Sequence, residues 1–123
     1  MIGIDLIEPA RLQESLARTP GLRESLFHPG ELIYCEAQAH PAEHLAARYS
    51  AKEAVVKALG LDGFDPLDVE VLEGGENCAV VLHGSAAVRA RELHVIVTIS
   101  LTHLAGVAGA VALATPSAPA SGR

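Results

Sequence analysis

The sequence predicts an α+β fold in one compact domain, on three observations. The chain has 123 residues, half of them apolar, which is enough for a single hydrophobic core. Residues 41–60 carry apolar side chains at the spacing of a long helix. Short apolar runs typical of buried strands lie near both ends of the chain, at 2–7, 96–101 and 107–113.

The remaining elements follow from local signals. Pro9 and Pro41 suit the first turn of a helix, and Gly60 suits a left-handed cap at the end of one. Ser85 can cap a further helix, and Gly74-Gly75 marks a turn between two strands. The expected order is a strand at 2–7, helices at 9–18, 29–39 and 41–60, strands at 67–72 and 79–82, a helix at 85–93, and strands at 96–101 and 107–113.

Composition limits the possible functions. The expected domain covers residues 1–114, and the Pro, Ala, Ser and Gly tail at 115–123 is expected to be disordered. The net charge is −6, with no basic stripe and only 3% aromatic residues, which argues against nucleic acid as a partner. A core with so few aromatics consists of Leu, Val, Ile and Ala, so an oligomer is a plausible source of further burial.

The cysteines and the N-terminus indicate a cytoplasmic protein. Cys35 and Cys78 lie in unlike contexts without metal-binding spacing, which fits a reducing compartment. Asp5 and Glu8 interrupt any signal-peptide core, and the apolar run 105–114 is about half the ~20 residues that a membrane helix needs. We therefore expect no membrane segment.

The segment RYSAKEAVVKALG at 48–60 carries the most information. It contains the only two lysines, Lys52 and Lys57, with Glu53 between them. On a helix Lys52 falls within an arc of apolar residues, and Glu53 lies near the edge of that arc. A charge on the buried side needs a partner, because an uncompensated buried charge costs several kcal/mol. The pattern predicts a site, although Glu53 and Lys57 also have the i,i+4 spacing of a simple exposed ion pair.

Four short motifs occur in order along the chain: GIDLIEPAR at 3–11, FHPGE at 27–31, RYSAKEAVVKALG at 48–60 and SLTH at 100–103. Together they resemble the phosphopantetheinyl transferases, specifically the small holo-acyl-carrier-protein synthase type, over roughly residues 2–113. The resemblance implies an antiparallel sheet packed on the long helix. It also implies transfer of the 4′-phosphopantetheine arm of coenzyme A to a serine of an apo acyl carrier protein, with release of 3′,5′-ADP.

The resemblance implies roles for particular residues. Asp5 and Glu53 match the family's Mg²⁺ ligands, and oxygen ligands of this kind suit that ion. The implied catalytic residues are Glu53, Lys57 and His103, with a metal-bound water oriented by Glu53 as the preferred base. The implied coenzyme contacts are Arg48, Lys52, Lys57, Ser100 and His103. Arg11 would dock the acidic carrier, while Glu8 and Glu31 would help shape the site.

Several of these residues also have a structural alternative. Asp5 could cap the next turn, and Arg48 could lie on a solvated helix face. Lys52 could extend its ammonium group past the apolar arc into water. Glu31 is also expected in the first turn of a helix for dipole reasons, and a lone histidine such as His103 is more often structural.

One turn departs from the family pattern. Residues 74–78, GGENC, replace the usual G-[KR]-P, so that Glu76 stands where a positive residue is expected. An alternative therefore stays open, in which the protein keeps the transferase fold but has lost or changed its activity and binds a carrier protein or an acyl-pantetheine. Retention of Asp5, Glu53 and Lys57 favours the enzyme, acting on carriers of fatty-acid or polyketide synthesis.

The resemblance finally implies a homotrimer with the coenzyme groove between subunits. The strands at 96–101 and 107–113 are apolar on both alternating faces. One face can pack on the long helix and the other needs cover, which neighbouring copies would supply. Val111 is a candidate for that interface.

Overall fold

The computed structural model describes residues 1–74 and 78–118. The elements are β1 (Ile2–Ile7), α1 (Pro9–Arg18), α2 (Leu22–Leu26), α3 (Pro29–Glu36), α4 (Pro41–Leu59), β2 (Val69–Leu72), β3 (Ala79–Leu82), α5 (Gly84–Leu93), β4 (Val95–Leu104) and β5 (Val107–Pro116). The strands pair antiparallel and the helices lie between them in sequence. The predicted α+β class is confirmed.

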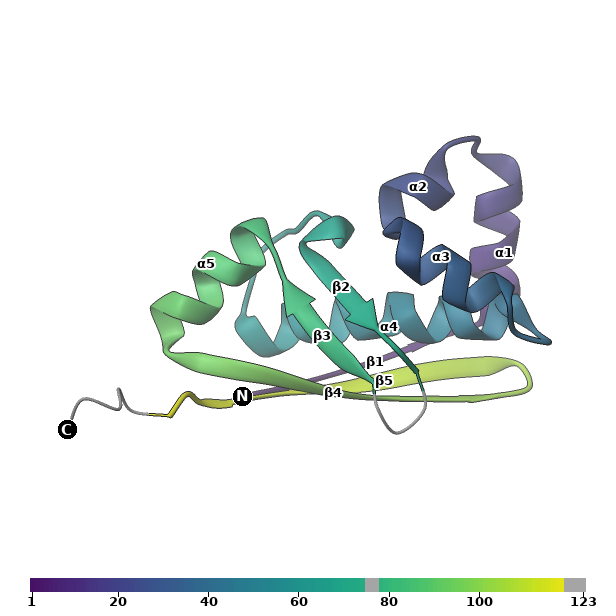
Figure 1. Ribbon diagram of the computed structural model, residues 1–123. Coiled ribbons are helices and arrows are strands. Elements are labelled where there is room, and N and C mark those ends of the chain that lie inside the picture. The colour runs from purple at the N-terminus through teal and green to yellow at the C-terminus, as the bar shows by residue number, and fades with distance from the viewer. Residues whose placement is uncertain (75–77, 119–123) are drawn as a thin grey trace.

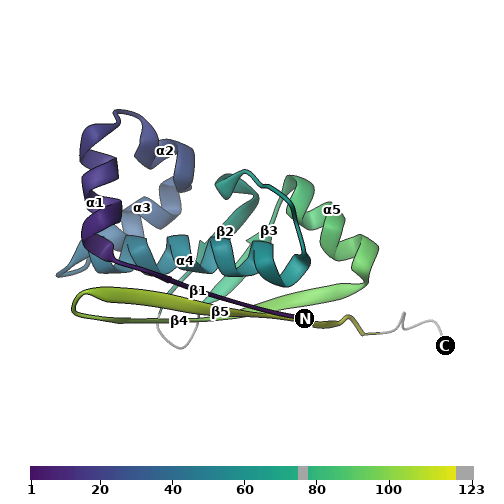
Figure 2. The same cartoon turned by 180° about the vertical axis from the view of Figure 1, so that it is seen from behind.

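The long helix α4 lies between two layers (Figure 1). On one side is the three-stranded sheet in the order β1-β5-β4. On the other side, α1, α2 and α3 lie over one end of α4, and the β2–β3 hairpin with α5 lies over the other end. Figure 2 shows the same arrangement from behind. Because both layers pack on α4, this helix is buried on most of its circumference rather than along one stripe.

Small residues let the sheet approach α4 closely. A Cβ atom at Gly3 would lie 2.0 Å from the carbonyl oxygen of Ala54, so only glycine fits there. The β5 residues that face α4 are buried alanines: Ala108, Ala110, Ala112 and Ala114. Successive side chains of a strand alternate between faces, so Asp5 lies on the same face as Gly3 and is directed toward α4.

The end of α4 is fixed by its C-terminal cap. Gly60 adopts a left-handed conformation with φ 66°, as its position in the sequence predicted. Its N–H donates to the carbonyl oxygen of Lys57 at 3.3 Å, and the N–H of Leu61 donates to that of Val56 at 3.1 Å. The cap therefore holds Lys57 in the last turn of the helix, near the sheet.

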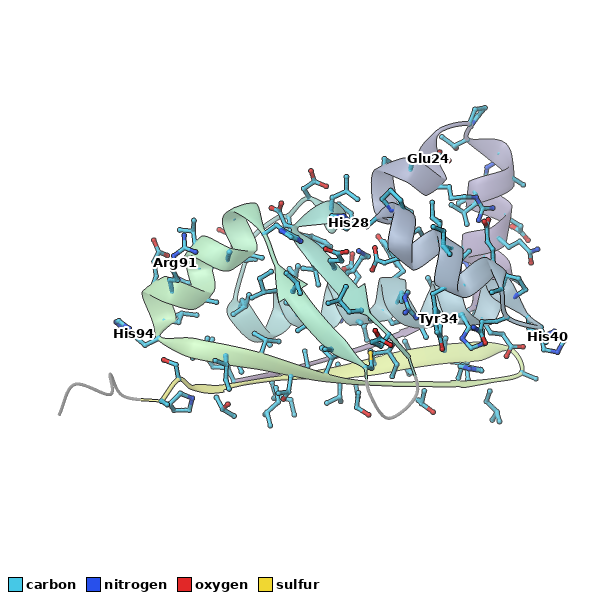
Figure 3. All side chains as sticks on the ribbon, in the orientation of Figure 1. Glu24, His28, Tyr34, His40, Arg91 and His94 are labelled. Carbon is cyan, nitrogen blue, oxygen red and sulfur yellow. The ribbon has the colours of Figure 1, made fainter. Side chains whose placement is uncertain are left out.

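The opposite face of the sheet is not covered by the described residues. Its large apolar side chains are 41% to 69% exposed, and they are Ile2, Ile4, Leu6, Ile96 and Leu113. Figure 3 shows side chains projecting from this side of the sheet. The prediction that β4 is apolar on both faces is wrong, because Thr98, Ser100 and Thr102 point outward there. The first strand, β1, supplies most of the exposed apolar surface.

Several boundaries differ from the prediction. The short helix α2 was not expected, α3 ends at Glu36, and β2 begins at Val69 because Pro66–Asp68 forms a 3-10 turn capped by the Asp65 carboxylate. The last strand, β5, runs two residues past the predicted domain boundary. Of the rest of the expected tail, Ser117 donates to the His94 carbonyl oxygen, and 119–123 lie outside the described residues. Within the described ranges, no helix has the length and hydropathy needed to span a bilayer.

Candidate active site

Two predicted carboxylates meet at the junction of β1 and α4. Asp5 comes from β1, while Glu53 and Lys57 come from successive turns of α4. The Lys57 ammonium lies 3.1 Å from Asp5 Oδ1 and donates to the carbonyl oxygen of Ile4 at 3.0 Å. The pairing of Lys57 with Asp5, 52 positions away, makes this a tertiary contact rather than the local i,i+4 pair considered from the sequence.

Tyr49 links Asp5 and Glu53. Burial raises the pKa of the Tyr49 hydroxyl to about 12, with further contributions from the Glu53 carboxylate, which accepts its hydrogen bond, and from Asp5. The carboxylates of Asp5 and Glu53 therefore both raise the pKa of the Tyr49 hydroxyl. Tyr49 lies one helical turn before Glu53. The structure thus places Asp5 against Lys57, and places both Asp5 and Glu53 near Tyr49. The sequence analysis did not single out Tyr49, although its i,i+4 spacing to Glu53 could have indicated this role.

The donor set of this cluster fits Mg²⁺. Carboxylate oxygens are hard ligands, and Mg²⁺ needs only one or two of them because it keeps several waters and binds substrate phosphates. The Asp5 side chain is 19% exposed and Lys57 is 54% exposed, so the cluster is open to a ligand. Lys57 engages Asp5 Oδ1, and among the described residues no hydrogen bond is made to Oδ2.

Three other predicted residues border a second cavity, of about 410 Å³, on the β4 side of α4. Arg48 comes from α4, and Ser100 and His103 come from β4. Arg48 is only 2% exposed, because its guanidinium stacks 4.3 Å from the Tyr34 ring and donates to the Glu73 carbonyl oxygen. Its Nε is buried and has no hydrogen-bond partner among the described residues, so the guanidinium beside the cavity keeps an unsatisfied donor.

His103 belongs to a group of polar rings on the wall of this cavity. Its Nδ1 lies 2.9 Å from Glu43 Oε1, and its ring packs edge-on against that of His44 at 4.8 Å. Burial, His103 and Arg48 lower the pKa of His44, with Glu43 acting in the opposite direction. The sequence analysis missed His44 and Glu43, although the i,i+4 spacing of His44 and Arg48 places them on one side of α4.

Ser100 reaches this cavity through its backbone. It is paired in register with Val111 and exposed on the uncovered face of the sheet, away from α4. A shallow depression on that face is bordered by Ile4, Leu6, Ser100, Thr102 and Val111, among others. The Ser100 hydroxyl and the Arg48 guanidinium of one chain are therefore on opposite sides of the sheet.

The prediction that Lys52 contacts a coenzyme is wrong. Lys52 is completely buried, and its ammonium lies 2.9 Å from Glu31 Oε1, 3.0 Å from the Pro66 carbonyl oxygen and in contact with that of Val69. Burial lowers the pKa of Lys52, and the Glu31 carboxylate opposes that shift. Its partner is thus internal, and no face of the ammonium is available to a ligand.

Glu31 organises the core rather than the reaction site. Its second carboxylate oxygen accepts from the N–H of Val71 at 2.9 Å, and Oε1 also accepts from the N–H of His28 at 2.8 Å. Both oxygens of this buried carboxylate therefore accept hydrogen bonds, from three donors in total. The pair of Glu31 and Lys52 joins α3, α4 and the start of β2.

Arg11 lies beside a cavity of about 530 Å³ between α1, α2 and β1. Arg11 is 79% exposed and is 3.7 Å from Glu8, which is 63% exposed. The same cavity is bordered by Leu12, Leu26 and Tyr49, so it reaches from the exposed Arg11 to the carboxylate cluster. In the turn that differs from the family pattern, residues 75–77, which include Glu76, lie outside the described residues.

Comparisons with known proteins identify the family of this chain. Residues 1–111 match the model of the family described as the 4′-phosphopantetheinyl transferase superfamily. A holo-[acyl-carrier-protein] synthase from Moorella thermoacetica is 46% identical over 119 residues, covering 94% of this chain and 93% of that one. A holo-[acyl-carrier-protein] synthase from Streptomyces avermitilis is 44% identical over 116 residues, covering 92% and 94%.

Solved structures show the same fold. The holo-[acyl-carrier-protein] synthase of Helicobacter pylori in complex with coenzyme A gives a TM-score of 0.78 at 25% identity, covering 94% of this chain and 100% of that one. The coenzyme A complex of the synthase from Chronobacterium ammoniagenes gives 0.81 at 28% identity, covering 96% and 98%. On the motifs, the fold and these relatives, this chain belongs to the 4′-phosphopantetheinyl transferase superfamily.

Proposed function

We propose that this protein is a holo-[acyl-carrier-protein] synthase, which transfers the 4′-phosphopantetheine arm of coenzyme A to a serine of an apo acyl carrier protein. The observation that carries the proposal is the convergence of Asp5, Glu53 and Lys57 at one open site. Relatives named for this activity match the chain over nearly its full length. The serine oxygen forms a bond to the β-phosphorus, the pyrophosphate P–O bond breaks, and 3′,5′-ADP leaves with the bonding electrons.

The residues of the cluster divide this work. Asp5 and Glu53 would hold Mg²⁺, which supplies charge neutralisation at the pyrophosphate when bound. Lys57 adds a positive charge where negative charge develops on the phosphoryl oxygens. Glu53 orients a water that takes the serine proton. Tyr49 lies beside Glu53 and stays neutral because burial and the Glu53 carboxylate raise its pKa to about 12.

Coenzyme A would also use the cavity of Arg48 and His103. The positive charge of the buried Arg48 guanidinium beside the cavity and the 35% exposed imidazole of His103 suit the remaining phosphates of the coenzyme. Arg11 would bind the acidic carrier, beside the apolar cavity that leads to Tyr49. A cytoplasmic location remains part of the proposal, supported by Cys35 and Cys78, which are both free thiols.

The two halves of this site are best joined by neighbouring copies in a homotrimer. Within one chain, Asp5 and His103 lie on the outer strands β1 and β4, with β5 between them. Two strand spacings separate them by about 10 Å. The uncovered apolar face, led by Ile2, Ile4 and Leu6, offers the surface for assembly. A neighbour's β4 edge could then complete the site at β1.

The activity is tested by incubating the protein with apo carrier protein, coenzyme A and Mg²⁺ and measuring the intact mass of the carrier. We expect a gain of one phosphopantetheine, abolished by a chelator of divalent ions. No gain with carriers of either fatty-acid or polyketide synthesis would contradict the proposal.

The shared site is tested by subunit mixing. Glu53→Gln should be inactive and His103→Ala weakly active, whereas refolding them together in equal amounts should restore about a quarter of the wild-type activity. Half of the chains carry an intact Glu53 and the other half an intact His103, so about one interface in four pairs the two. Light scattering should give the mass of three chains, and Val111→Asp should lower both mass and activity. A monomer with full activity would refute the shared site.

A further inference from the structure

A second group of metal-binding side chains lies away from the carboxylate cluster. It consists of His28 at the start of α3, Glu70 on β2 and His83 just before α5. Their donor atoms all lie within 4.8 Å of one another. The Nε2 atom of His83 is 2.9 Å from Glu70 Oε1, Nδ1 of His28 is 4.0 Å from the same oxygen, and the two rings are 5.3 Å apart.

The backbone holds these three residues in place. The N–H of His28 donates to Glu31 Oε1 at 2.8 Å, and the N–H of His83 donates to the Asp68 carbonyl oxygen at 2.7 Å. Glu70 is fixed by the β2–β3 ladder, between the buried Val69 and Val71. The three side chains are therefore positioned by the buried Glu31–Lys52 pair on one side and by the β2–β3 hairpin on the other. Figure 3 labels His28 at the junction between the N-terminal helices and the hairpin.

One histidine is already oriented for metal binding. Nε2 of His28 lies 2.7 Å from the Leu67 carbonyl oxygen, which accepts its proton. Nδ1 of the same ring then keeps its lone pair and faces Glu70. Imidazole ligands of metal ions commonly donate their other N–H to a carbonyl in this way, which fixes both tautomer and ring orientation.

We propose that His28, Glu70 and His83 form a binding site for one divalent transition-metal ion of the Zn²⁺ type. Two imidazoles and one carboxylate are a frequent ligand set for Zn²⁺, at bond lengths of about 2.0–2.2 Å, which places tetrahedral ligand atoms about 3.4 Å apart. Glu70 Oε1 lies 2.9 Å from His83 Nε2 and 4.0 Å from His28 Nδ1, so the two distances are just below and just above that spacing. His83 is 43% exposed, so ions and a solvent ligand have access.

The chemistry of this site separates it from that of Asp5 and Glu53. Imidazole nitrogens favour Zn²⁺ and its neighbours, whereas an all-oxygen set favours Mg²⁺. An ion bound to His28, Glu70 and His83 would tie α3 to the hairpin. Just after β2, the Glu73 carbonyl oxygen accepts a hydrogen bond from Arg48, which borders the cavity assigned to coenzyme A. The ion is expected to stabilise the fold rather than to take part in phosphoryl transfer.

The test uses untagged, full-length protein freed of metal with a chelator. Titration with Co²⁺, followed by its visible absorption, should show saturable uptake of one ion per chain, and Zn²⁺ should displace it. Zn²⁺ at about 100 times its Kd should raise the melting temperature by about 5–10 °C. His83→Ala and Glu70→Gln should each weaken binding by more than about 10-fold and remove the thermal shift.

Two matched controls keep the result specific. His94→Ala removes an exposed histidine at the opposite end of α5, and Asp5→Asn alters the Mg²⁺ cluster, so both should bind Co²⁺ like the wild type. Absence of saturable Co²⁺ uptake by the wild type would overturn the proposal. So would unchanged binding in His83→Ala, or loss of binding in His103→Ala alone, because the ion would then lie elsewhere.

Discussion

Replacing Lys52 with methionine should destabilise the protein by about 3–5 kcal/mol, the usual cost of removing one partner from a buried ion pair. Lys52 and Glu31 are both completely buried and their charged atoms are 2.9 Å apart. Without the ammonium, the Glu31 carboxylate is left uncompensated, and the carbonyl oxygens of Pro66 and Val69 lose their donor. Methionine has a similar length, so the change in packing volume adds little.

The double variant Lys52→Met with Glu31→Gln separates charge from packing. A glutamine at position 31 carries no charge, although its one amide oxygen can accept from only one of the His28 and Val71 N–H groups, which contact different carboxylate oxygens of Glu31. The double variant should therefore be more stable than Lys52→Met alone by about 1–3 kcal/mol. Urea unfolding followed by circular dichroism gives both values from the midpoint and slope of each transition.

The same variants decide whether Lys52 touches the coenzyme. Folded Lys52→Met should keep the wild-type KM for coenzyme A, because the ammonium has no open face. A stability loss below about 1 kcal/mol, the value of an exposed pair, would refute the buried-pair argument. A raised KM in a variant of normal stability would return Lys52 to the binding site.

Three further results follow from the geometry. Arg11→Glu should raise the KM for the carrier far more than that for coenzyme A, while the control Arg91→Glu on α5 changes neither; equal effects on both substrates would exclude docking at Arg11. Burial raises the pKa of the Cys35 thiol from 9.0 to about 11, so the folded state keeps a proton that the unfolded chain releases. The protonated thiol adds about 2–3 kcal/mol to the free energy of unfolding below pH 9, and this contribution is lost by about pH 11. Urea unfolding between pH 9 and pH 11 measures the loss. A Cys35→Ala variant that loses as much stability as the wild type over this range would contradict the assignment. His103→Ala should raise the pKa of His44 in an NMR titration, because His103 helps to lower it; an unchanged pKa would count against their coupling.

Local signals predicted the framework of the fold. Pro41 and Gly60 mark the ends of α4, and the apolar run of β1 needs only strand periodicity to be recognised. The short helix α2 has five residues after Gly21, too few for a periodic pattern to appear. The outward direction of Ser100 depends on the register with β5, and local sequence does not define that register.

The candidate site was predicted less evenly. Asp5, Glu53 and Lys57 were identified through the motifs, and the fold brings them together. Lys52 was correctly placed on the buried side of α4, and a buried charge does require a partner. That partner is Glu31, 21 positions away on another helix, and sequence periodicity does not define which distant residues meet. Tertiary packing therefore decides between a ligand contact and an internal ion pair.

The most direct test of the catalytic assignment compares Glu53→Gln with Glu92→Gln in the transfer reaction. Glu92 is an exposed residue of α5, 3.7 Å from Arg89, so it serves as a matched control for loss of one carboxylate. With apo carrier, coenzyme A and Mg²⁺, the mass of the carrier should increase by one phosphopantetheine with wild type and Glu92→Gln and stay unchanged with Glu53→Gln. Wild-type rates with folded Glu53→Gln would contradict the assignment of the transfer site to Asp5, Glu53 and Lys57.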